Sequence, residues 1–279
     1  VTQSAGAFAQ VLAGVSLIIT QFERLSAYLA GVQRLGGLWD DLDEFDAEEE
    51  RVALEGTQEV DEDSLTVNLD TLTVRTPDGS KTLVNDLSFE LRRNQSLLIM
   101  GASGTGKSSV LRTIAGLWPI GSGALERPSW RDIMFLPQRP YMIDGNLRDQ
   151  LLYPYTDQAL SDDKILAVVE KVNLADVLDR VDNDLGRVID WINVLSIGEQ
   201  QRVAIARLFL RNPKFAFLDE ATSALDEDNQ ERLYQLLKES RIGFISVGHR
   251  TTLTKYHDRV LQLDRSGRWE IRAEGVTAD

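Results

Sequence analysis

Short runs of apolar residues recur along the chain and predict its strands. Runs in which apolar and polar residues alternate predict strands with one buried face. Continuously apolar runs are typical of strands that a parallel sheet buries on both faces. The alternating runs are residues 65–69, 72–74, 82–84 and 87–91. The continuous runs are residues 96–100, 133–136, 214–219 and 242–247.

Apolar residues at helical spacing separate these predicted strands. We expect helices at residues 109–117, through most of 144–194, from 195 to about 211, and at 226–240. A hairpin is expected from the runs 260–263 and 269–271, which flank Arg265–Gly267. An antiparallel region followed by parallel strands that alternate with helices is typical of an α/β fold.

Residues 1–39 carry apolar side chains at helical spacing. Their most apolar part, residues 5–19, has about 15 residues, whereas crossing a bilayer takes roughly 20. The segment lacks the basic start and small-residue cleavage site of a signal peptide. Two interpretations stay open: an amphipathic helix that packs on its own domain or on a partner, or the cytoplasmic end of a last membrane helix. In the second case the chain from Val1 would be part of a longer polypeptide.

An acidic segment follows. Residues 40–63 hold 13 Asp and Glu and one basic residue, Arg51, within a chain whose net charge is −14. Such a run predicts a solvated linker without chemistry of its own. The negative charge argues against a general nucleic-acid-binding protein. The absence of cysteine excludes disulfides and thiolate metal sites.

The candidate chemistry begins at residues 101–108, Gly-Ala-Ser-Gly-Thr-Gly-Lys-Ser, which match the phosphate-binding loop G-x-x-x-x-G-K-[ST]. The glycines let backbone N–H groups curl round a phosphate, and the following helix points its N-terminus at the same anion. Lys107 would reach the β- and γ-phosphates, and the Ser108 hydroxyl would ligate Mg²⁺. The predicted nucleotide-binding residues of this loop are Gly101, Ala102, Ser103, Gly104, Thr105, Gly106, Lys107, Ser108 and Ser109.

Polar residues follow three of the predicted parallel strands, at the sheet edge where ligands bind. Asp219 would hold Mg²⁺ through water, and Glu220 would orient or deprotonate the attacking water. Gln138 follows another strand, where its amide can reach the metal or the water. His249 follows a third, where its imidazole can donate to a γ-phosphate. Taken alone, Gln138 and His249 also fit a purely structural role.

Ser196 and Glu199 match the S-x-x-E capping box, which predicts the start of a helix. Gly198 lies close behind, so this helix start exposes backbone N–H groups to an anion. A helix cap alone and a phosphate contact are equally compatible with the spacing. A serine hydroxyl can serve both, because it donates one hydrogen bond and accepts others.

Together these elements resemble the nucleotide-binding domain of an ABC transporter. The elements, in chain order, are the phosphate loop, Gln138, Leu-Ser-x-Gly-Glu at 195–199, Phe-Leu-Asp-Glu at 217–220, Ser-Ala-Leu-Asp at 223–226 and His249. The resemblance implies a P-loop NTPase (ABC ATPase) core with an antiparallel β-subdomain and a helical subdomain at about 140–200, within an ATP-binding domain at 64–279. It implies ATP and Mg²⁺ as cofactors.

The resemblance also implies a homodimer in which two ATP molecules are bound at the interface. Each lies between the phosphate loop of one chain and the signature motif, residues 195–199, of the other. Ser196 and Gly198 would then bind the γ-phosphate held by the other protomer. Asp226 would be the D-loop acid at the dimer interface. Gln138, the Q-loop residue, would be a catalytic and metal-binding residue that links the site to a membrane domain, and His249 would be the H-loop histidine.

A narrower likeness is to the branch that holds the peroxisomal fatty-acyl half-transporters and their bacterial relatives, whose membrane domain is of the peptide and cobalamin importer type. The segments that carry it are residues 114–119, 136–142, 147–154 and 191–202. In that branch the ATPase domain follows the membrane domain. Residues 1–39 would then be the end of the last membrane helix and its cytoplasmic extension, and the ATPase would work at the cytoplasmic face of the cell inner membrane. A soluble ABC ATPase of translation or DNA repair, and a non-hydrolysing nucleotide sensor, are the alternatives.

The chain departs from the usual family pattern in two places. Ile197 and Glu199 stand where the signature has glycine and glutamine. A carboxylate near a triphosphate would repel the phosphates, unless the carboxylate faces the backbone of its own helix, as it does in a capping box. Residues 72–80 contain no aromatic side chain to stack on adenine. Arg75, through its guanidinium plane, or Pro77, by packing, would take that place.

Overall fold

The structure is a computed structural model. It describes residues 21–39 apart from 23, 27 and 38, and then residues 57–59, 65–118, 121–156 and 159–273. The chain divides into two compact units, Val1–Val52 and Ala53–Asp279.

In the first unit the described residues between 21 and 39 are helical. Large apolar side chains of this helix, among them Phe22 and Leu35, are exposed. The expectations for residues 1–20, and for the acidic segment apart from residues 57–59, lie outside the described residues. Within the part of the chain that the structure describes, no helix combines the length and the apolar character needed to cross a bilayer.

The second unit contains a largely parallel sheet, as the continuous apolar runs predicted. In spatial order its described strands are β10 (Trp269–Ala273), β9 (Arg259–Leu263), β4 (Ser96–Gly101), β8 (Gly243–Val247), β7 (Phe215–Asp219) and β6 (Ile133–Leu136). Only β10 runs antiparallel to its neighbour among these strands, and it forms the predicted hairpin with β9. Strands β4, β6, β7 and β8 are parallel, so their carboxyl ends meet at one edge of the sheet.

A second sheet contains the predicted antiparallel strands. Its described order is β1 (Thr57–Glu59), β5 (Gly121–Arg127), β2 (Thr66–Arg75) and β3 (Thr82–Arg92). The short strand β1 lies inside the acidic segment, so the linker prediction is wrong for those residues. It pairs in parallel with β5 through backbone groups, which need no apolar side chains. Strand β5 was missed because its sequence, Gly-Ser-Gly-Ala-Leu-Glu-Arg, lacks an apolar alternation.

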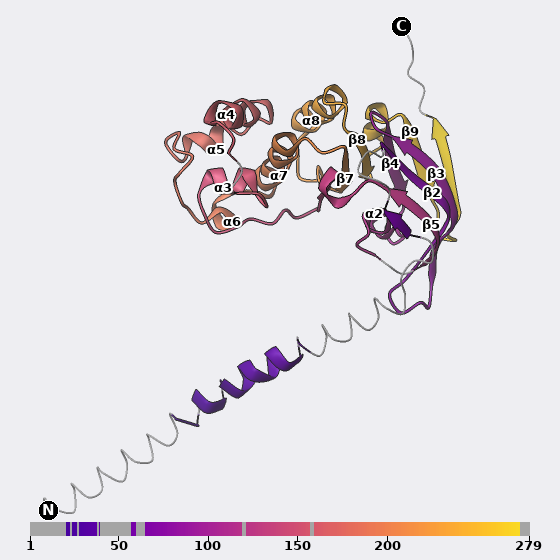
Figure 1. The fold of residues 1–279 in the computed structure, drawn as a ribbon, viewed down its shortest axis with the longest axis horizontal. Coiled ribbons are helices and arrows are strands. Elements are labelled where there is room, and N and C mark those ends of the chain that lie inside the picture. Colours follow the sequence, from indigo (N-terminus) through magenta and orange to yellow (C-terminus); the bar gives the residue numbers. More distant parts are fainter. Residues whose placement is uncertain are drawn as a thin grey trace, which may run out of the picture. The chain divides into compact units, whose positions relative to one another are not determined.

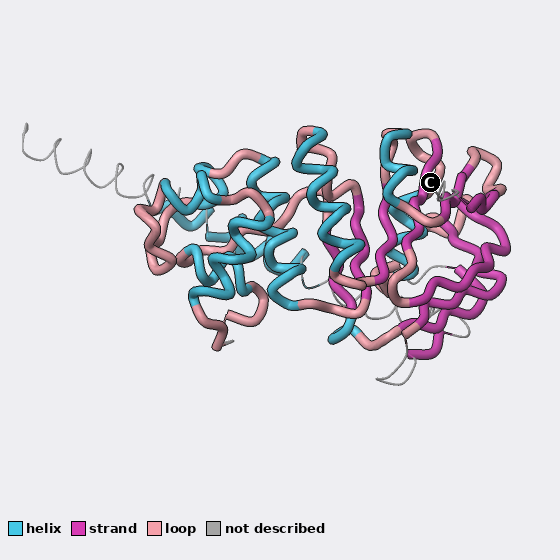
Figure 2. Tube along the Cα trace, turned by 90° about the horizontal axis from the view of Figure 1, so that it is seen from above, coloured by secondary structure: helices cyan, strands magenta, loops and turns pink. Residues whose placement is uncertain are grey.

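Most helices of the second unit occur where the apolar spacing predicted them. They are α3 (Leu147–Leu152), α4 (Asp162–Lys171), α5 (Ala175–Asp179), α6 (Trp191–Val194), α7 (Ile197–Arg211) and α8 (Glu227–Glu239), with 3₁₀ turns η1 (Trp130–Asp132) and η2 (Thr251–Tyr256). Helices α3 to α6 gather at one end of this unit, and α7 and α8 lie between them and the sheets (Figure 1). Figure 2 shows the strands gathered toward the other end.

Helix α2 (Lys107–Ile114) begins and ends earlier than the predicted 109–117. Gly106, which precedes it, has a φ of 91°, so the chain leaves the phosphate loop directly into the helix. Gly116 has a φ of 74°, which a helix cannot continue through. The helix therefore starts at the lysine of the motif, and its first N–H groups face the loop.

Apolar residues of the parallel sheet pack into two cores, one on each face. Successive strand residues point to opposite faces, so Leu97 and Ile99 join the core with α2 and the antiparallel sheet, whereas Leu98 joins the core with the helices α3 to α8. The same alternation places Phe217 in the first core and Leu218 in the second. A sheet buried on both faces holds its strand ends rigidly, and the candidate site is built on those ends.

Candidate functional site

The phosphate loop joins β4 to α2, and two of its glycines are required by the fold. Gly101 has a φ of 151°, and a Cβ atom there would lie 2.5 Å from the carbonyl oxygen of Leu263. Gly106 has a φ of 91°, and a Cβ atom there would lie 2.9 Å from Cβ of Leu83. Ala102, Ser103, Gly104 and Thr105 complete the loop, and Ser109 follows on α2. The loop can therefore curl tightly only with glycine at both ends.

Lys107 points its ammonium group into this loop. Its Nζ donates hydrogen bonds to the carbonyl oxygens of Gly101 at 3.1 Å and Ala102 at 3.0 Å. Burial lowers the pKa of the Lys107 ammonium, and the carboxylates of Glu220 and Asp219 oppose that shift. The cation is thus held at the centre of the loop, facing acids from the end of β7.

Ser108 contacts the last residue of β7. Its hydroxyl donates to Oδ1 of Asp219 at 2.6 Å, and Nη2 of Arg112 donates to Oδ2 at 3.1 Å. The structure therefore brings together Ser108 and Asp219, two of the three residues that the sequence assigned to Mg²⁺. The sequence reasoning missed Arg112. Its spacing of four residues from Ser108, which puts both on one helix face, was the available signal.

Glu220 lies at the centre of a second group. Its Oε2 accepts a hydrogen bond from Nε2 of Gln138 at 3.0 Å, and its Oε1 lies 2.7 Å from Nε2 of His249. Since an ionised carboxylate only accepts, Nε2 of His249 carries the proton in this contact. The three residues follow β6, β7 and β8, as predicted. Gln138 contacts Glu220 here and not the pair of Ser108 and Asp219, so its assignment to the metal stays a prediction.

A small hollow lies beside this group. It has a volume of about 80 Å³ and is lined by Glu220, His249, Ser223 and Arg250, among others. That is more than the space one water molecule occupies. A carboxylate, an imidazole and room for water occur together at the end of β7. Such an arrangement can position a water molecule and accept a proton from it.

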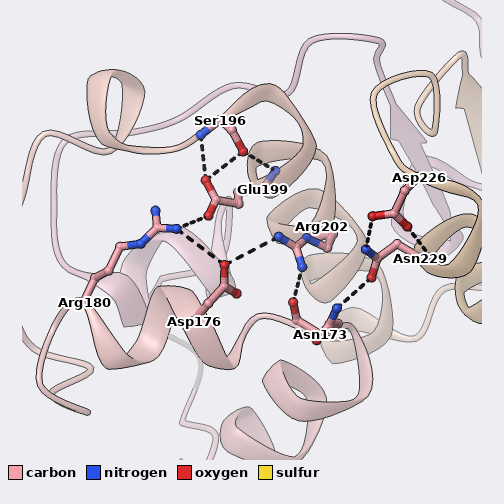
Figure 3. Close-up of polar contacts among 8 residues, drawn as sticks. All are labelled: Asn173, Asp176, Arg180, Ser196, Glu199, Arg202, Asp226 and Asn229. Atoms are coloured by element: carbon pink, nitrogen blue, oxygen red, sulfur yellow. Dashed lines mark hydrogen bonds and ion pairs between the residues drawn. The ribbon is translucent and has the colours of Figure 1, made fainter.

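The predicted capping box is confirmed at the start of α7. Oγ of Ser196 accepts from the backbone N–H of Glu199 at 3.3 Å, and the Glu199 carboxylate accepts from the Ser196 N–H at 2.7 Å (Figure 3). At Gly198 a Cβ atom would lie 3.0 Å from the carbonyl oxygen of Ala224, so glycine lets the loop after β7 approach this helix start. The helix cap is real, and the phosphate contact of Ser196 and Gly198 stays a prediction.

Gln201 ties the same helix start to the loops of the candidate site. Its buried amide donates to the carbonyl oxygen of Gln138 at 3.0 Å and accepts from the N–H of Ala224 at 3.1 Å. The sequence reasoning missed this residue, because its partners lie far away along the chain. No spacing within α7 indicates which glutamine faces them.

Asp226 caps α8. Its two carboxylate oxygens accept from the backbone and side-chain amides of Asn229, each at 2.8 Å (Figure 3). The hydrogen bonds described for Ser196 and Asp226 run to the helical part of the unit and not to residues 101–109. The structure thus assembles two separate groups of predicted residues. The residues around Lys107 and Glu220 form one, and Ser196, Gly198 and Asp226 form the other.

Arg75, at the end of β2, is exposed, and its carbonyl oxygen accepts from the indole N–H of Trp118 at 2.9 Å. The fold thus brings an aromatic side chain to a turn whose own sequence contains none. Trp118 lies 43 residues after Arg75 along the chain, so the sequence of the turn itself does not indicate it. The adenine contact of Arg75 stays a prediction.

An aromatic groove flanks Gln138. It has a volume of about 470 Å³, and its walls include Trp130, Pro137, Tyr141, Tyr153, Tyr155, Arg207 and Arg211. The guanidinium groups of Arg207 and Arg211 stack over Tyr153 and Tyr155 at 5.2 and 5.1 Å from the ring centroids. Burial lowers the pKa of Arg207 to about 10, and Tyr153 opposes the shift. The lining residues include two cations and no carboxylate among those that the structure describes.

Comparison with known proteins gives three findings. The profile of the ABC transporter family matches residues 84–223. The chain is 44% identical over 274 residues to an uncharacterized ABC transporter ATP-binding protein of Synechocystis, covering 97% of this chain and 41% of that protein. It is 37% identical over 347 aligned positions to the chloroplastic ABC transporter D family member 2 of Arabidopsis thaliana, covering all of this chain and 49% of that protein. The chain thus spans less than half the length of both relatives.

A solved structure shares the fold. A bacterial Atm1-family ABC exporter with ATP bound superposes with a TM-score of 0.67 at 24% sequence identity, over 79% of this chain and 41% of that one. At this identity the likeness concerns the fold alone.

Proposed function

This chain belongs to the ABC transporter family, whose ATP-binding domains hydrolyse ATP, and we propose that it powers transport of a solute across a membrane. The observation that carries the proposal is the meeting of four strand ends, those of β4, β6, β7 and β8. Lys107, Asp219 and Glu220 converge there with Gln138 and His249. This set supplies a phosphate cradle, oxygen ligands and a proton acceptor at one sheet edge.

The donor set around Ser108 fits Mg²⁺. Within the described residues no group of three or more His, Cys, Asp or Glu side chains could hold a metal by protein ligands alone. Mg²⁺ is usually bound through one or two carboxylates together with substrate phosphates and water. Ser108 and Asp219, already 2.6 Å apart, would hold it with the ATP phosphates. When bound, the ion would neutralise charge on the β- and γ-phosphates.

In this proposal Glu220 accepts a proton from the attacking water. Its contacts with Gln138 and His249 fix the carboxylate at the end of β7. Its own backbone has a φ of 51°, a left-handed conformation that turns the side chain sharply off the strand. His249 can donate a hydrogen bond to the γ-phosphate once its contact with Glu220 opens.

The remaining predicted residues would act on a second copy of the chain. Ser196 and Gly198 expose the N-terminus of α7, where backbone N–H groups favour an anion. Asp226 is connected to the helical part of the unit through Asn229, which accepts a hydrogen bond from Asn173 in the loop before α5 (Figure 3). We infer a homodimer in which these residues face the ATP that the other copy holds around Lys107.

A membrane domain is the second partner in this proposal. The aromatic groove beside Gln138 would receive a loop of that domain. The groove is concave and mostly apolar, and it lies next to Gln138, which contacts Glu220. The exposed apolar helix between residues 21 and 39 would continue from the membrane domain. The chain would then work at the cytoplasmic face of the cell inner membrane.

Replacing Glu220 by glutamine tests the proposal. Glutamine keeps the size of the side chain but cannot accept a proton, so ATP hydrolysis is expected to fall by about 100-fold or more. ATP affinity should be retained, and ATP should hold the variant as a dimer. Phosphate release and light scattering measure the two effects, with Glu270→Gln on the exposed strand β10 as the matched control. Undiminished phosphate release in Glu220→Gln would refute the assignment of the base.

A further inference from the structure

The carboxylate of Glu199 is enclosed at the start of α7. Its Oε2 accepts from both the backbone N–H and the hydroxyl of Ser196, each at 2.7 Å, and its Oε1 accepts from Nη2 of Arg180 (Figure 3). The Glu199 side chain is 7% exposed, whereas that of Arg180 is 42% exposed. One carboxylate therefore joins the serine of the signature motif to a cation from the loop after α5.

This carboxylate carries a negative charge where the proposed function needs a phosphate to approach. Burial opposes ionisation of Glu199, but the hydrogen bonds from Arg180 and Ser196 outweigh it and lower the pKa to about 2. An uncompensated charge at this position would repel a triphosphate. Arg180 supplies the compensating positive charge within hydrogen-bonding distance.

The same contacts decide which groups of the signature motif face outward. The hydroxyl proton and the backbone N–H of Ser196 are both directed to Glu199. The N–H groups of Ile197 and Gly198, in the first turn of α7, have no partner within the helix. Fixing the Glu199 carboxylate therefore fixes Ser196 inward and presents these two N–H groups toward an anion.

Arg180 is itself held by a chain of polar contacts. Its Nη2 donates to Asp176 at 3.4 Å, and Asp176 lies 3.8 Å from Arg202. Arg202 donates to the carbonyl oxygen of Asn173, and the Asn173 side chain donates to Asn229, the partner of Asp226, at 2.9 Å (Figure 3). The chain therefore runs from Ser196 to Asp226. Both ends are residues that the proposed function places against the partner's ATP.

We propose that Arg180 is a positioning residue of the ATP site, which cancels the charge of Glu199 and, through it, holds Ser196 inward and sets the N-terminal N–H groups of α7 to receive the γ-phosphate of the partner's ATP. The inference rests on the proposed function. Arg180 does not itself touch the nucleotide in this arrangement. Its effect therefore depends on the carboxylate at residue 199 and vanishes when that charge is removed.

A double-mutant cycle tests this dependence. Arg180→Ala leaves Glu199 uncompensated, so turnover and ATP-driven dimerisation are expected to weaken about tenfold or more. Affinity for ATP in the monomer, which depends on the phosphate loop of the same chain, should not change. Arg180→Ala combined with Glu199→Gln removes the charge but keeps an oxygen that accepts from Ser196, and is expected to recover wild-type values within about threefold. Dimerisation is measured in the Glu220→Gln background and turnover without it.

Two further variants separate charge from structure. Arg180→Lys keeps the positive charge and should retain most of the activity. Asp176→Asn removes the charge of the other partner of Arg180 but keeps an oxygen that can accept its hydrogen bond and leaves Glu199 compensated, so its loss of activity should stay well below that of Arg180→Ala. Equal losses in Arg180→Ala and in the double variant would mean that Arg180 only anchors its loop, and would overturn the inference alone. Absence of turnover in the wild-type chain would overturn the proposed function and the inference with it. Circular dichroism confirms that each variant is folded.

Discussion

At the scale of single residues, the same side chain serves the fold and the chemistry. Lys107 donates to two loop carbonyls, which satisfies a buried ammonium group and holds it where phosphates would bind. Glu220 is held by Gln138 and His249 in the same way. These contacts fix the side chains before any ligand arrives, and such preorganisation reduces the reorganisation needed on binding.

Replacing Lys107 by alanine should weaken nucleotide binding. Hydrogen bonds to charged groups contribute about 1.5–3 kcal/mol each, so affinity for ATP is expected to fall by about tenfold to a hundredfold. Titration with a fluorescent ATP analogue measures the change, with Lys164→Ala on the exposed face of α4 as control. Equal affinity in Lys107→Ala and the wild type would contradict the proposed phosphate site.

At the scale of elements, α7 connects the two groups of site residues. Its first turn carries Ser196, Gly198 and Glu199, and one turn later Gln201 reaches the loops that follow β6 and β7. A shift of α7 would therefore move the signature motif and Gln138 together. The partners of Gln201 are a backbone carbonyl and a backbone N–H, and its side-chain amide satisfies both because it donates and accepts hydrogen bonds.

Replacing Gln201 by alanine should destabilise the second unit. The change leaves the carbonyl oxygen of Gln138 and the N–H of Ala224 without their partner in a partly buried site, which costs about 1 kcal/mol or more. The free energy of unfolding from urea titration measures this, and Gln235→Ala on the exposed face of α8 is the matched control. A loss no greater than that of the control would show that water replaces the amide.

At the scale of the whole molecule, a histidine is buried in the core that packs on one face of the parallel sheet. His257, after η2, is 3% exposed and packs against the rings of Tyr234 and Phe244. Its Nδ1 lies 2.8 Å from the carbonyl oxygen of Leu253, and Nε2 has no hydrogen-bond partner among the described residues. Burial lowers the pKa of His257 to about 4, and the Leu253 carbonyl opposes the shift.

This histidine makes folding stability depend on pH. The folded pKa of about 4 lies below the ordinary 6.5, so between these values the unfolded chain binds a proton that the folded chain does not. Stability should therefore fall as pH decreases from about 6.5 toward 4, by about 1 kcal/mol at pH 5.5 from this group. Urea titrations at pH 7.5 and 5.5 measure the loss, which should be smaller in His257→Asn, because its amide stays neutral. An unchanged loss in that variant would contradict the assignment.

Much of the second unit follows from local sequence patterns. The apolar runs predicted β4, β6, β7 and β8, and the capping box predicted the start of α7, because both signals depend on neighbouring residues alone. Strands β1 and β5 were not predicted. Their pairing joins residues 57–59 to 125–127, and the backbone bonds that stabilise it leave no mark in the side chains.

The sequence by itself determined the phosphate loop, the acids after β7 and the capped start of α7, since each is a short motif whose residues act within a turn or two of one another. Only the tertiary structure decided that Gln138 and His249 form hydrogen bonds with Glu220, that Gln201 reaches the loop after β7, and that Arg180 neutralises Glu199. These contacts join residues 19 to 82 positions apart. The contacts of Glu220 exist because parallel strands must cross over through helices, which returns distant strand ends to one edge, and no local spacing encodes which side chains meet there. Arg180 meets Glu199 because the helices between β6 and β7 pack into one core.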